Sequence, residues 1–171
     1  MNPRSPAHGT KAANGKPVNT TMAPPKSAAA AACGLPKREI EFASHPANLC
    51  LVREFVRQFL RTQNFPESEK DLMVLGLDEA CTNVIRYAYE QKPDQLIRLV
   101  CQETANGVQF SVRDYGRQAQ PEQLCGRPLD LVQPGGLGIH LIRRAFDQVD
   151  YKLKRCGTEL ILRRTQPRPR R

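Results

Sequence analysis

The stretch from Leu77 to Ile85 constrains this chain most, because it places an acid and an amide four residues apart in a long helical pattern. At that spacing Glu79 and Asn83 lie on one face of a helix, one turn apart. A carboxylate and an amide between apolar stripes are partly buried and need polar partners, which a divalent metal ion with a phosphate would supply. The alternative is a structural pair satisfied by neighbouring backbone. The stripes are Met73, Leu77, Ala80, Val84 and Ala88 on one side and Val74, Cys81 and Ile85 on the other.

The positive charge of the chain, +9 over 171 residues, is concentrated at its two ends. Residues 1–38 carry six of the 26 basic residues and no acidic one, and residues 163–171 carry five arginines. Residues 39–162 therefore keep 15 basic residues against all 17 acidic ones. A nucleic-acid-binding domain would have a basic surface, so direct nucleic-acid binding by the folded part is not expected. A nucleic-acid association through the ends alone is a weaker alternative.

Composition divides the chain into three parts. Residues 1–36 are rich in Ala, Pro, Lys, Asn and Thr and lack aromatic residues and apolar periodicity, which predicts a disordered basic tail. Residues 37–165 have the length of one domain with a full core. Residues 166–171 are expected to form a basic C-terminal tail, and the Pro and Arg residues of 163–171 are typical of a solubilising end.

The sequence indicates neither membrane contact nor cysteine chemistry. It has no apolar run of roughly 7–15 residues near its start, as in a signal peptide, and none of roughly 18–20 residues to span a bilayer. The six cysteines have no paired spacing, which argues against a metal site or a disulfide framework. Free thiols suit a reducing compartment, so a cytoplasmic location is expected.

Hydrophobic periodicity predicts an α+β domain. Ser44 and Pro46 are typical of a helix start, and Asn106-Gly107 is typical of a hairpin turn. Strands in hairpins with helices grouped between them predict a two-layer sandwich, in which a mixed or mostly antiparallel sheet is covered on one face by helices. Strands are expected at residues 39–42, 96–101, 108–112, 149–153 and 160–162, and helices at about 46–60, 66–89 and 138–146.

Residues 115–136 form a long stretch with several Gly and Pro residues and little periodicity. A loop of this length inside a compact domain is usually a functional lid or a disordered segment. It ends at Gly135-Gly136-Leu137-Gly138, directly before the third expected helix. Free N–H groups and the positive end of the helix dipole favour a phosphate at such a place. Alone, this motif is only a Gly-rich helix start.

Two shorter motifs accompany the helix and the loop. Asp114 ends an expected strand and precedes Tyr115-Gly116. Its carboxylate could accept a hydrogen bond from the exocyclic amine of adenine, and the glycine would let the base or a water approach the backbone. Alone, D-x-G is a common turn, and Gly157-Thr158 at a hairpin would also be just a turn.

Together and in this order, the motifs resemble those of the Bergerat-fold ATPase superfamily, which includes gyrase, the mismatch-repair ATPases and histidine kinases. The resemblance is greatest to its anti-sigma-factor serine/threonine protein kinase branch, and it spans about residues 38–164. The family's helix motif, E-A-x-T-N-x-I-x-x-x-Y, is matched from Glu79 to Tyr89. The other matches are Asp114 and Gly116 to D-x-G, Gly136-Leu137-Gly138 to G-x-G, and Gly157-Thr158 to the final G-T.

The resemblance implies a role for each motif residue. Glu79 would be the general base on a substrate serine hydroxyl or on water, and Asn83 would ligate the Mg²⁺ that bridges the ATP phosphates. These roles suit the chemistry, because Mg²⁺ prefers hard oxygen ligands and phosphoryl transfer needs chiefly positioning and charge neutralisation. The remaining ATP-binding residues implied are Asp114, Gly116 and Thr158 around adenine, and Gly136, Leu137 and Gly138 around the phosphates.

The function implied is that of an ATP- and Mg²⁺-dependent protein serine/threonine kinase that acts as an anti-sigma regulatory factor. It would phosphorylate a serine of a small antagonist protein and sequester a sigma factor; a homodimer is left open. Gln118 stands where many relatives have a second Gly, and Tyr87 stands where a His is frequent. These departures bear on phosphoryl transfer more than on nucleotide binding. The alternative is a nucleotide-responsive protein-binding switch of the same fold without kinase activity.

Overall fold

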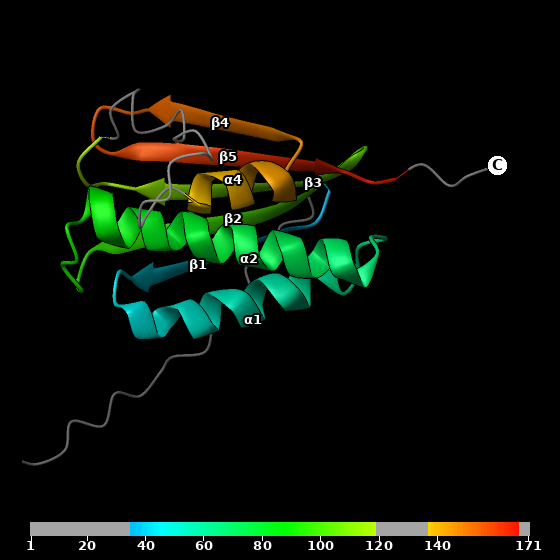
Figure 1. The fold of residues 1–171 in the computed structure, drawn as a ribbon, viewed down its shortest axis with the longest axis horizontal. Helices are drawn as coiled ribbons and strands as arrows, with labels where there is room; N and C mark the ends of the chain where they lie inside the picture. The colour runs from blue at the N-terminus through cyan, green and yellow to red at the C-terminus, as the bar shows by residue number, and fades with distance from the viewer. Residues whose placement is uncertain (1–34, 119–136, 168–171) are drawn as a thin grey trace, which may run out of the picture. The chain divides into compact units, whose positions relative to one another are not determined.

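A computed structural model describes residues 35–118 and 137–167 of the chain (Figure 1). These residues form five strands and three α-helices, with a 3₁₀ turn before α1 and a π-helical turn after α2. The elements are β1 (Lys37–Ala43), η1 (Pro46–Asn48), α1 (Leu49–Leu60), α2 (Glu67–Asn83), η2 (Val84–Ala88), β2 (Leu96–Thr104), β3 (Gly107–Asp114), α4 (Leu137–Ala145), β4 (Gln148–Leu153) and β5 (Thr158–Thr165).

The strands form one sheet in the order β1-β2-β3-β5-β4, and every described strand pair is antiparallel. Figure 1 shows α1, α2 and α4 on one face of this sheet. The central strand β3 alternates strictly, because Val108, Phe110, Val112 and Asp114 are buried and the residues between them are half-buried. The predicted two-layer α+β sandwich is confirmed.

The core lies between the sheet and the helices and is centred on Phe110. Its ring contacts those of Phe59 and Phe146 edge-on, with centroids 5.8 Å apart in both pairs. Helices α2 and α4 pack closely at Gly76, where an added Cβ would lie 2.8 Å from Ala145 Cβ. Burial of such apolar side chains is the dominant favourable contribution to folding. This close packing determines where the first turn of α4 meets the polar side of α2.

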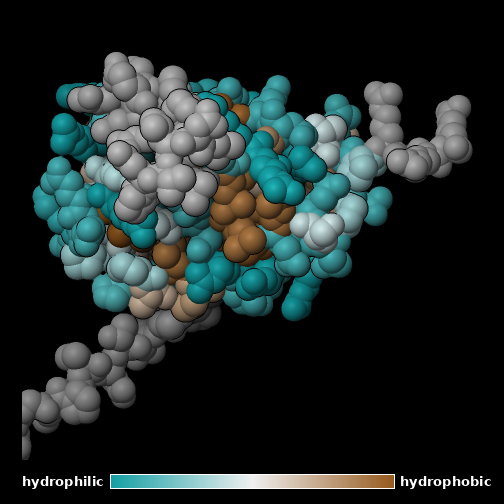
Figure 2. Space-filling view, in the orientation of Figure 1, coloured by the Kyte–Doolittle hydropathy of each residue, from teal (hydrophilic) through white to brown (hydrophobic). Residues whose placement is uncertain are grey.

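Not all apolar side chains are covered. Figure 2 shows apolar residues reaching the surface near the middle of the helical face, surrounded by polar ones. Leu51 of α1 and Leu75 of α2 are both more than half exposed. Single exposed leucines are ordinary on a folded domain and need no special explanation.

The predicted elements are confirmed, with two corrections of detail. Ser44 does not cap a helix, because its hydroxyl donates to Lys92 O and accepts from the Gln95 amide, which joins the end of β1 to the segment before β2. Arg163 and Arg164 do not belong to a solubilising end, because both lie within β5.

Arg164 connects three parts of the fold. Its guanidinium lies 2.9 Å from Glu69 of α2 and 2.9 Å from Asp147, the residue before β4. Asp147 also accepts the Thr165 amide at 2.7 Å. Acidic partners distant in the sequence thus hold Arg164 in the sheet. The local run of basic residues around Arg164 does not reveal these partners.

The predicted tails at 1–36 and 166–171 lie almost entirely outside the described residues. At the two boundaries, Pro36 O accepts the Glu103 amide at 2.9 Å, and the Gln166 amide donates to Asn106 O at 2.8 Å. The loop predicted at 115–136 is described only as far as Gln118.

Candidate functional site

The predicted helix motif begins in the last five residues of α2 and continues through the π-helical turn to Tyr89. Ala80 and Cys81 of the motif are buried in the core, whereas Glu79 and Asn83 are half-buried on another face, as predicted. Burial raises the pKa of the Cys81 thiol to about 12, so this group stays neutral. π-turns inside helices are frequent at functional sites. The polar side of the motif is therefore the candidate for chemistry.

Glu79 lies against the first turn of α4. A Cβ added to Gly138 would fall 1.8 Å from Glu79 Oε1 and 2.6 Å from its Cγ. Only a residue without a side chain fits beside the carboxylate in this position, which gives a packing reason for the last glycine of the G-x-G motif. Two motifs that are far apart in the sequence, on α2 and at the start of α4, therefore meet at this carboxylate.

Asp114 is buried at the end of β3, with 3% of its surface exposed. Burial raises the pKa of its carboxyl group, although N–H donors from Gly116 and Thr158 and the charge of Arg113 act in the opposite direction. The Gly116 amide donates to Asp114 Oδ1 at 3.0 Å. The carboxylate is thus held in a fixed orientation at the end of the strand.

Thr158 supplies an unsatisfied polar atom beside this carboxylate. Its side chain is buried, and Oγ1 has no hydrogen-bond partner among the described residues. Its backbone N–H donates to Asp114, so the hydroxyl and the carboxylate belong to one cluster. A buried hydroxyl without a partner costs free energy. A further polar group is therefore expected at this place.

Two glycines allow the segments around Asp114 to approach each other. A Cβ on Gly116 would lie 2.3 Å from Ala88 O, and a Cβ on Gly157 would lie 2.2 Å from Asp114 O. Gly157 also has a φ of +69°, a left-handed conformation that favours glycine. The D-x-G and G-T motifs are thus in contact with each other, and the D-x-G motif contacts the π-turn after α2.

Tyr89, the last residue of the helix motif, fastens these segments to the end of the helix. Its hydroxyl donates to Leu96 O at the start of β2 and accepts from the Tyr115 amide, which lies 2.8 Å away. The side chain is 4% exposed, and burial raises the pKa of its phenol. Tyr89 is therefore an anchor for the chain that leaves β3.

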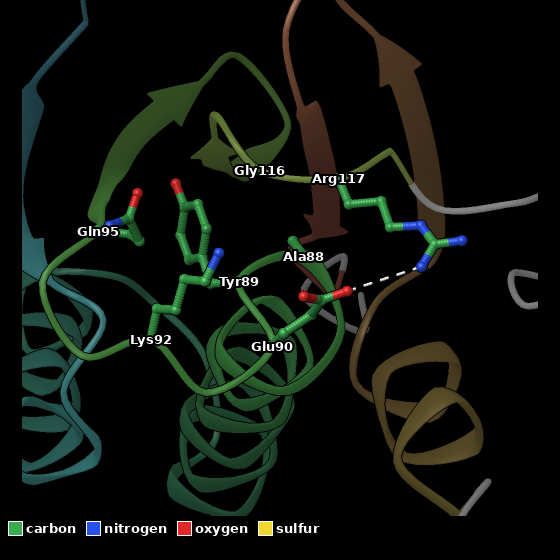
Figure 3. Close-up of a pocket in the computed structure, with 7 residues that line it drawn as sticks. All are labelled: Ala88, Tyr89, Glu90, Lys92, Gln95, Gly116 and Arg117. Carbon is green, nitrogen blue, oxygen red and sulfur yellow. Dashed lines mark ion pairs between the residues drawn. The ribbon is translucent and has the colours of Figure 1, made fainter.

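A pocket of about 200 Å³ opens beside Tyr89, between the end of α2 and the chain after β3 (Figure 3). Lys92 lines it, and so do Glu90 and Arg117, whose charged atoms are 3.7 Å apart. Glu90 and Gln91 have positive φ angles of 52° and 64°, which are strained for residues other than glycine. Gly116 of the predicted ATP site also lines this pocket.

The predicted site residues fall into two clusters. Asp114, Gly116 and Thr158 form one, and Glu79 with Gly138 forms the other. Asn83 lies one turn after Glu79 on α2, on the same side of the helix. The third part of the predicted site is not described, because Gly136 and the side chain of Leu137 lie outside the described residues. The individual roles stay predictions.

Two residues that organise the site were not identified as such from the sequence. Tyr89 was matched to the family motif without a role, although an aromatic residue just after a long helix could have suggested an anchor. Arg113, which contacts the segments around Asp114, gave no signal. A basic residue in an alternating strand has the pattern of an ordinary solvated position.

The comparisons with known proteins identify the family to which the chain belongs. The family described as the histidine kinase-like ATPase domain matches residues 42–164, which is most of the chain. The chain belongs to this family. Together with the relatives and the solved structure described below, this match confirms the resemblance to the Bergerat-fold ATPases and their anti-sigma kinase branch.

The relatives of this histidine kinase-like ATPase domain include two bacterial kinases. The serine-protein kinase RsbW of Bacillus thuringiensis is 22% identical over 121 residues, which cover 66% of this chain and 75% of that protein. The serine/threonine-protein kinase BtrW of Bordetella bronchiseptica is 30% identical over 94 residues, which cover 53% of this chain and 66% of that protein.

A solved structure shows the same fold. The crystal structure of RsbU and RsbW domains from Mycobacterium tuberculosis matches with a TM-score of 0.54 and 18% identity over 77% of this chain. The match covers 33% of that chain, so the present chain spans about a third of its length.

Membership of this family implies ATP binding. Among the described residues, no three His, Cys, Asp or Glu side chains lie close enough together to hold a metal ion by themselves. In the same part of the chain, no helix is both long and apolar enough for a bilayer span.

Proposed function

We propose that the protein is a cytoplasmic, ATP-dependent serine/threonine protein kinase that acts as an anti-sigma regulatory factor. It phosphorylates a serine on a small antagonist protein and sequesters a sigma factor. The observation that carries the kinase proposal is the position of Glu79. Its carboxylate lies against Gly138, at the N-terminal turn of α4, where a helix dipole favours phosphate.

The described residues fit ATP at its adenine end. Asp114 offers a buried carboxylate for the exocyclic amine, and the unsatisfied Thr158 hydroxyl offers a second hydrogen-bonding group beside it. A ligand that completes the hydrogen bonds of Thr158 removes the cost of leaving this group unpaired. This free-energy gain favours a nitrogen-rich base over an apolar ligand.

The described residues also fit Mg²⁺. Asn83 offers an amide oxygen, a hard ligand of the kind that Mg²⁺ takes together with waters and substrate phosphates. When bound, the ion supplies charge neutralisation for the phosphates. Asn83 is half-buried, so part of its surface is exposed to solvent.

Glu79 would act as the base in the transfer. The substrate serine oxygen forms a bond to the γ-phosphorus, and the bond between that phosphorus and the bridging oxygen of ADP breaks. The serine proton passes to Glu79. A positioned base of this kind typically contributes about 10²–10⁴-fold to the rate.

The experiment that tests this function is incubation of the full chain with labelled ATP, Mg²⁺ and small antagonist-like proteins from the same genome. Transfer of label to a serine, lost when that serine is changed to alanine, is the expected result. Binding of a sigma factor by the same preparation tests the second half of the proposal. If the chain binds no adenine nucleotide at all, the proposal is wrong.

The second candidate is a nucleotide-responsive switch that binds proteins without transferring phosphate. Gln118 and Tyr87 favour it, since both depart from the family pattern. Tyr87 is exposed and follows Asn83 by one turn. ATP binding without transfer to any serine-bearing partner, but with a change in partner affinity, would establish this alternative.

A further inference from the structure

Arg113 lies on the opposite face of the sheet from the candidate site. Its neighbours in β3, Val112 and Asp114, are buried beneath the helices, while Arg113 is half-buried on the open face. Across the sheet it is paired with Arg98 of β2 and Glu159 of β5. Such a position is usually occupied by a solvated charge, but the contacts of Arg113 differ from that pattern.

The guanidinium of Arg113 binds backbone carbonyls rather than an acid. It donates to Thr158 O at 3.0 Å and also to Cys156 O and Asp114 O. Its Cζ atom lies 4.5 Å from the ring centroid of Tyr115, a cation–π contact. One planar group therefore joins the segment 114–115 to the segment 156–158.

These two segments carry the side chains proposed to recognise adenine. Asp114 and Thr158 are the buried polar residues of the cluster, and Gly157 of the second segment packs closely against Asp114 O of the first. Cys156 adds a further connection, because its Sγ lies 3.0 Å from Tyr115 O. The distance between the two recognition side chains is thus set by backbone contacts that meet at Arg113.

We infer that Arg113 is a positioning residue for adenine recognition, which acts from the open face of the sheet by holding together the segments of Asp114 and Thr158. This inference rests on the proposed ATP binding and names a determinant of its base selectivity. A lysine cannot replace the arginine fully, because it lacks the planar set of donors that serves several carbonyls while stacking on a ring.

The same face offers a matched control in Arg163. It is also a half-buried arginine on β5, but it bonds only side chains in the described contacts, namely those of Gln109, Gln148 and Asp150. It lies five residues beyond Thr158 along the strand. Removal of Arg163 tests whether any loss of an arginine from this face has the same effect.

The experiment measures the dissociation constants of ATP and GTP for the full chain and for Arg113→Gln, Arg113→Lys and Arg163→Gln, together with the Tm of each. GTP shares the ribose and phosphates of ATP but has a carbonyl in place of the exocyclic amine. In Arg113→Gln we expect ATP affinity to fall about tenfold, the scale of one net hydrogen bond. GTP affinity should stay within about twofold, so the preference for ATP shrinks.

Arg113→Lys should retain an intermediate preference for ATP, and Arg163→Gln should retain the full preference. A structural role alone would lower the Tm and reduce both affinities equally, which would overturn the inference, as would unchanged ATP affinity in Arg113→Gln. If that variant does not fold, the ratio of affinities in Arg113→Lys decides in the same way. A wild-type chain that binds no ATP would instead overturn the proposed function.

Discussion

The adenine end and the phosphate end of the candidate site are constructed differently. At the adenine end, Asp114 and Thr158 lie at strand ends and are 3% and 5% exposed. Backbone amides, Tyr89 and Arg113 hold them from several sides. At the phosphate end, Glu79 projects from a helix, is half-buried, and has room only because Gly138 lacks a side chain.

This difference shows that the fold holds the adenine end more rigidly than the phosphate end. The carboxylate proposed to recognise a base, that of Asp114, must keep one orientation, and strand ends joined by backbone hydrogen bonds provide it. The carboxylate proposed to accept a proton, that of Glu79, must reach a substrate, and a helix face provides exposure. Changes at the adenine end should therefore alter affinity and selectivity, whereas changes at Glu79 should alter transfer.

The largest effect is expected for Glu79→Gln, which keeps the shape of the side chain and removes the base. Phosphoryl transfer should fall roughly 10²–10⁴-fold, while ATP affinity stays nearly intact. Single-turnover transfer and equilibrium binding measure the two quantities separately. Unchanged phosphorylation would rule out Glu79 as the base.

The matched control for this variant is Asp78→Asn, one residue away on α2. Asp78 is paired with Arg53 of α1 at 2.8 Å and is not part of the site. The pair is partly exposed, so its loss should cost no more than about 1 kcal/mol of stability. Transfer should remain close to the wild-type rate.

The next effect is expected for Gly138→Ala, because the new methyl group would overlap the Glu79 carboxylate. Glu79 must move away, and a displacement of about 1 Å can reduce a rate by about 10²-fold. The Tm should change little, since Glu79 is only half-buried.

Gly76→Ala is the contrasting variant. It crowds Ala145 in the core, so it should cost about 1–3 kcal/mol of stability, with transfer per folded molecule unchanged. An equal loss of stability in Gly138→Ala and Gly76→Ala would contradict the claim that Gly138 serves the site while Gly76 serves the core.

A smaller effect is expected for Asp114→Asn at the adenine end. Asparagine still accepts one hydrogen bond but presents no charge to the exocyclic amine, so ATP affinity should fall about tenfold. The affinity of inorganic triphosphate, measured by competition, should not change. A parallel loss of both affinities would mean that Asp114 maintains the fold rather than the base contact.

The smallest effect concerns stability and pH in the same variant. Because burial raises the pKa of the Asp114 carboxyl group, its contribution to stability is fully present below the unfolded value of about 3.9 and is lost as pH rises through the raised value. Asparagine does not titrate. The Tm of Asp114→Asn relative to wild type should therefore rise between pH 4 and pH 7. A relative Tm that falls over this range would show that the pKa is lowered instead.

Much of the fold could be predicted from local pattern. The alternation in β3 and the helical period around Met73 and Leu77 each depend on neighbours in the sequence, so periodicity identifies them. The five residues of the π-turn after Asn83 have an ordinary helical pattern, so periodicity does not distinguish this turn from the α-helix before it. The basic residue Arg164 was misassigned because its partners, Glu69 and Asp147, are brought to it only by folding.

The candidate site was predicted as a set of motifs but not as an arrangement. The contact of Glu79 with Gly138 joins residues 59 positions apart, and no spacing rule predicts it. The role of Arg113 depends on three backbone carbonyls, and because every residue has one, the sequence does not mark them. Side-chain chemistry can be read from a sequence, whereas backbone acceptors become visible only in the structure.

The most direct test of the account is the effect of Mg²⁺ on ATP affinity, measured by titration calorimetry in wild type and in Asn83→Ala. If Asn83 is a metal ligand, Mg²⁺ should tighten ATP binding to wild type, and this gain should disappear in the variant. Without Mg²⁺ the two proteins should bind ATP equally, because the adenine end is intact in both. An Mg²⁺-dependent gain that survives in Asn83→Ala, or a loss of ATP affinity that is the same with and without Mg²⁺, would contradict the assignment of the phosphate end.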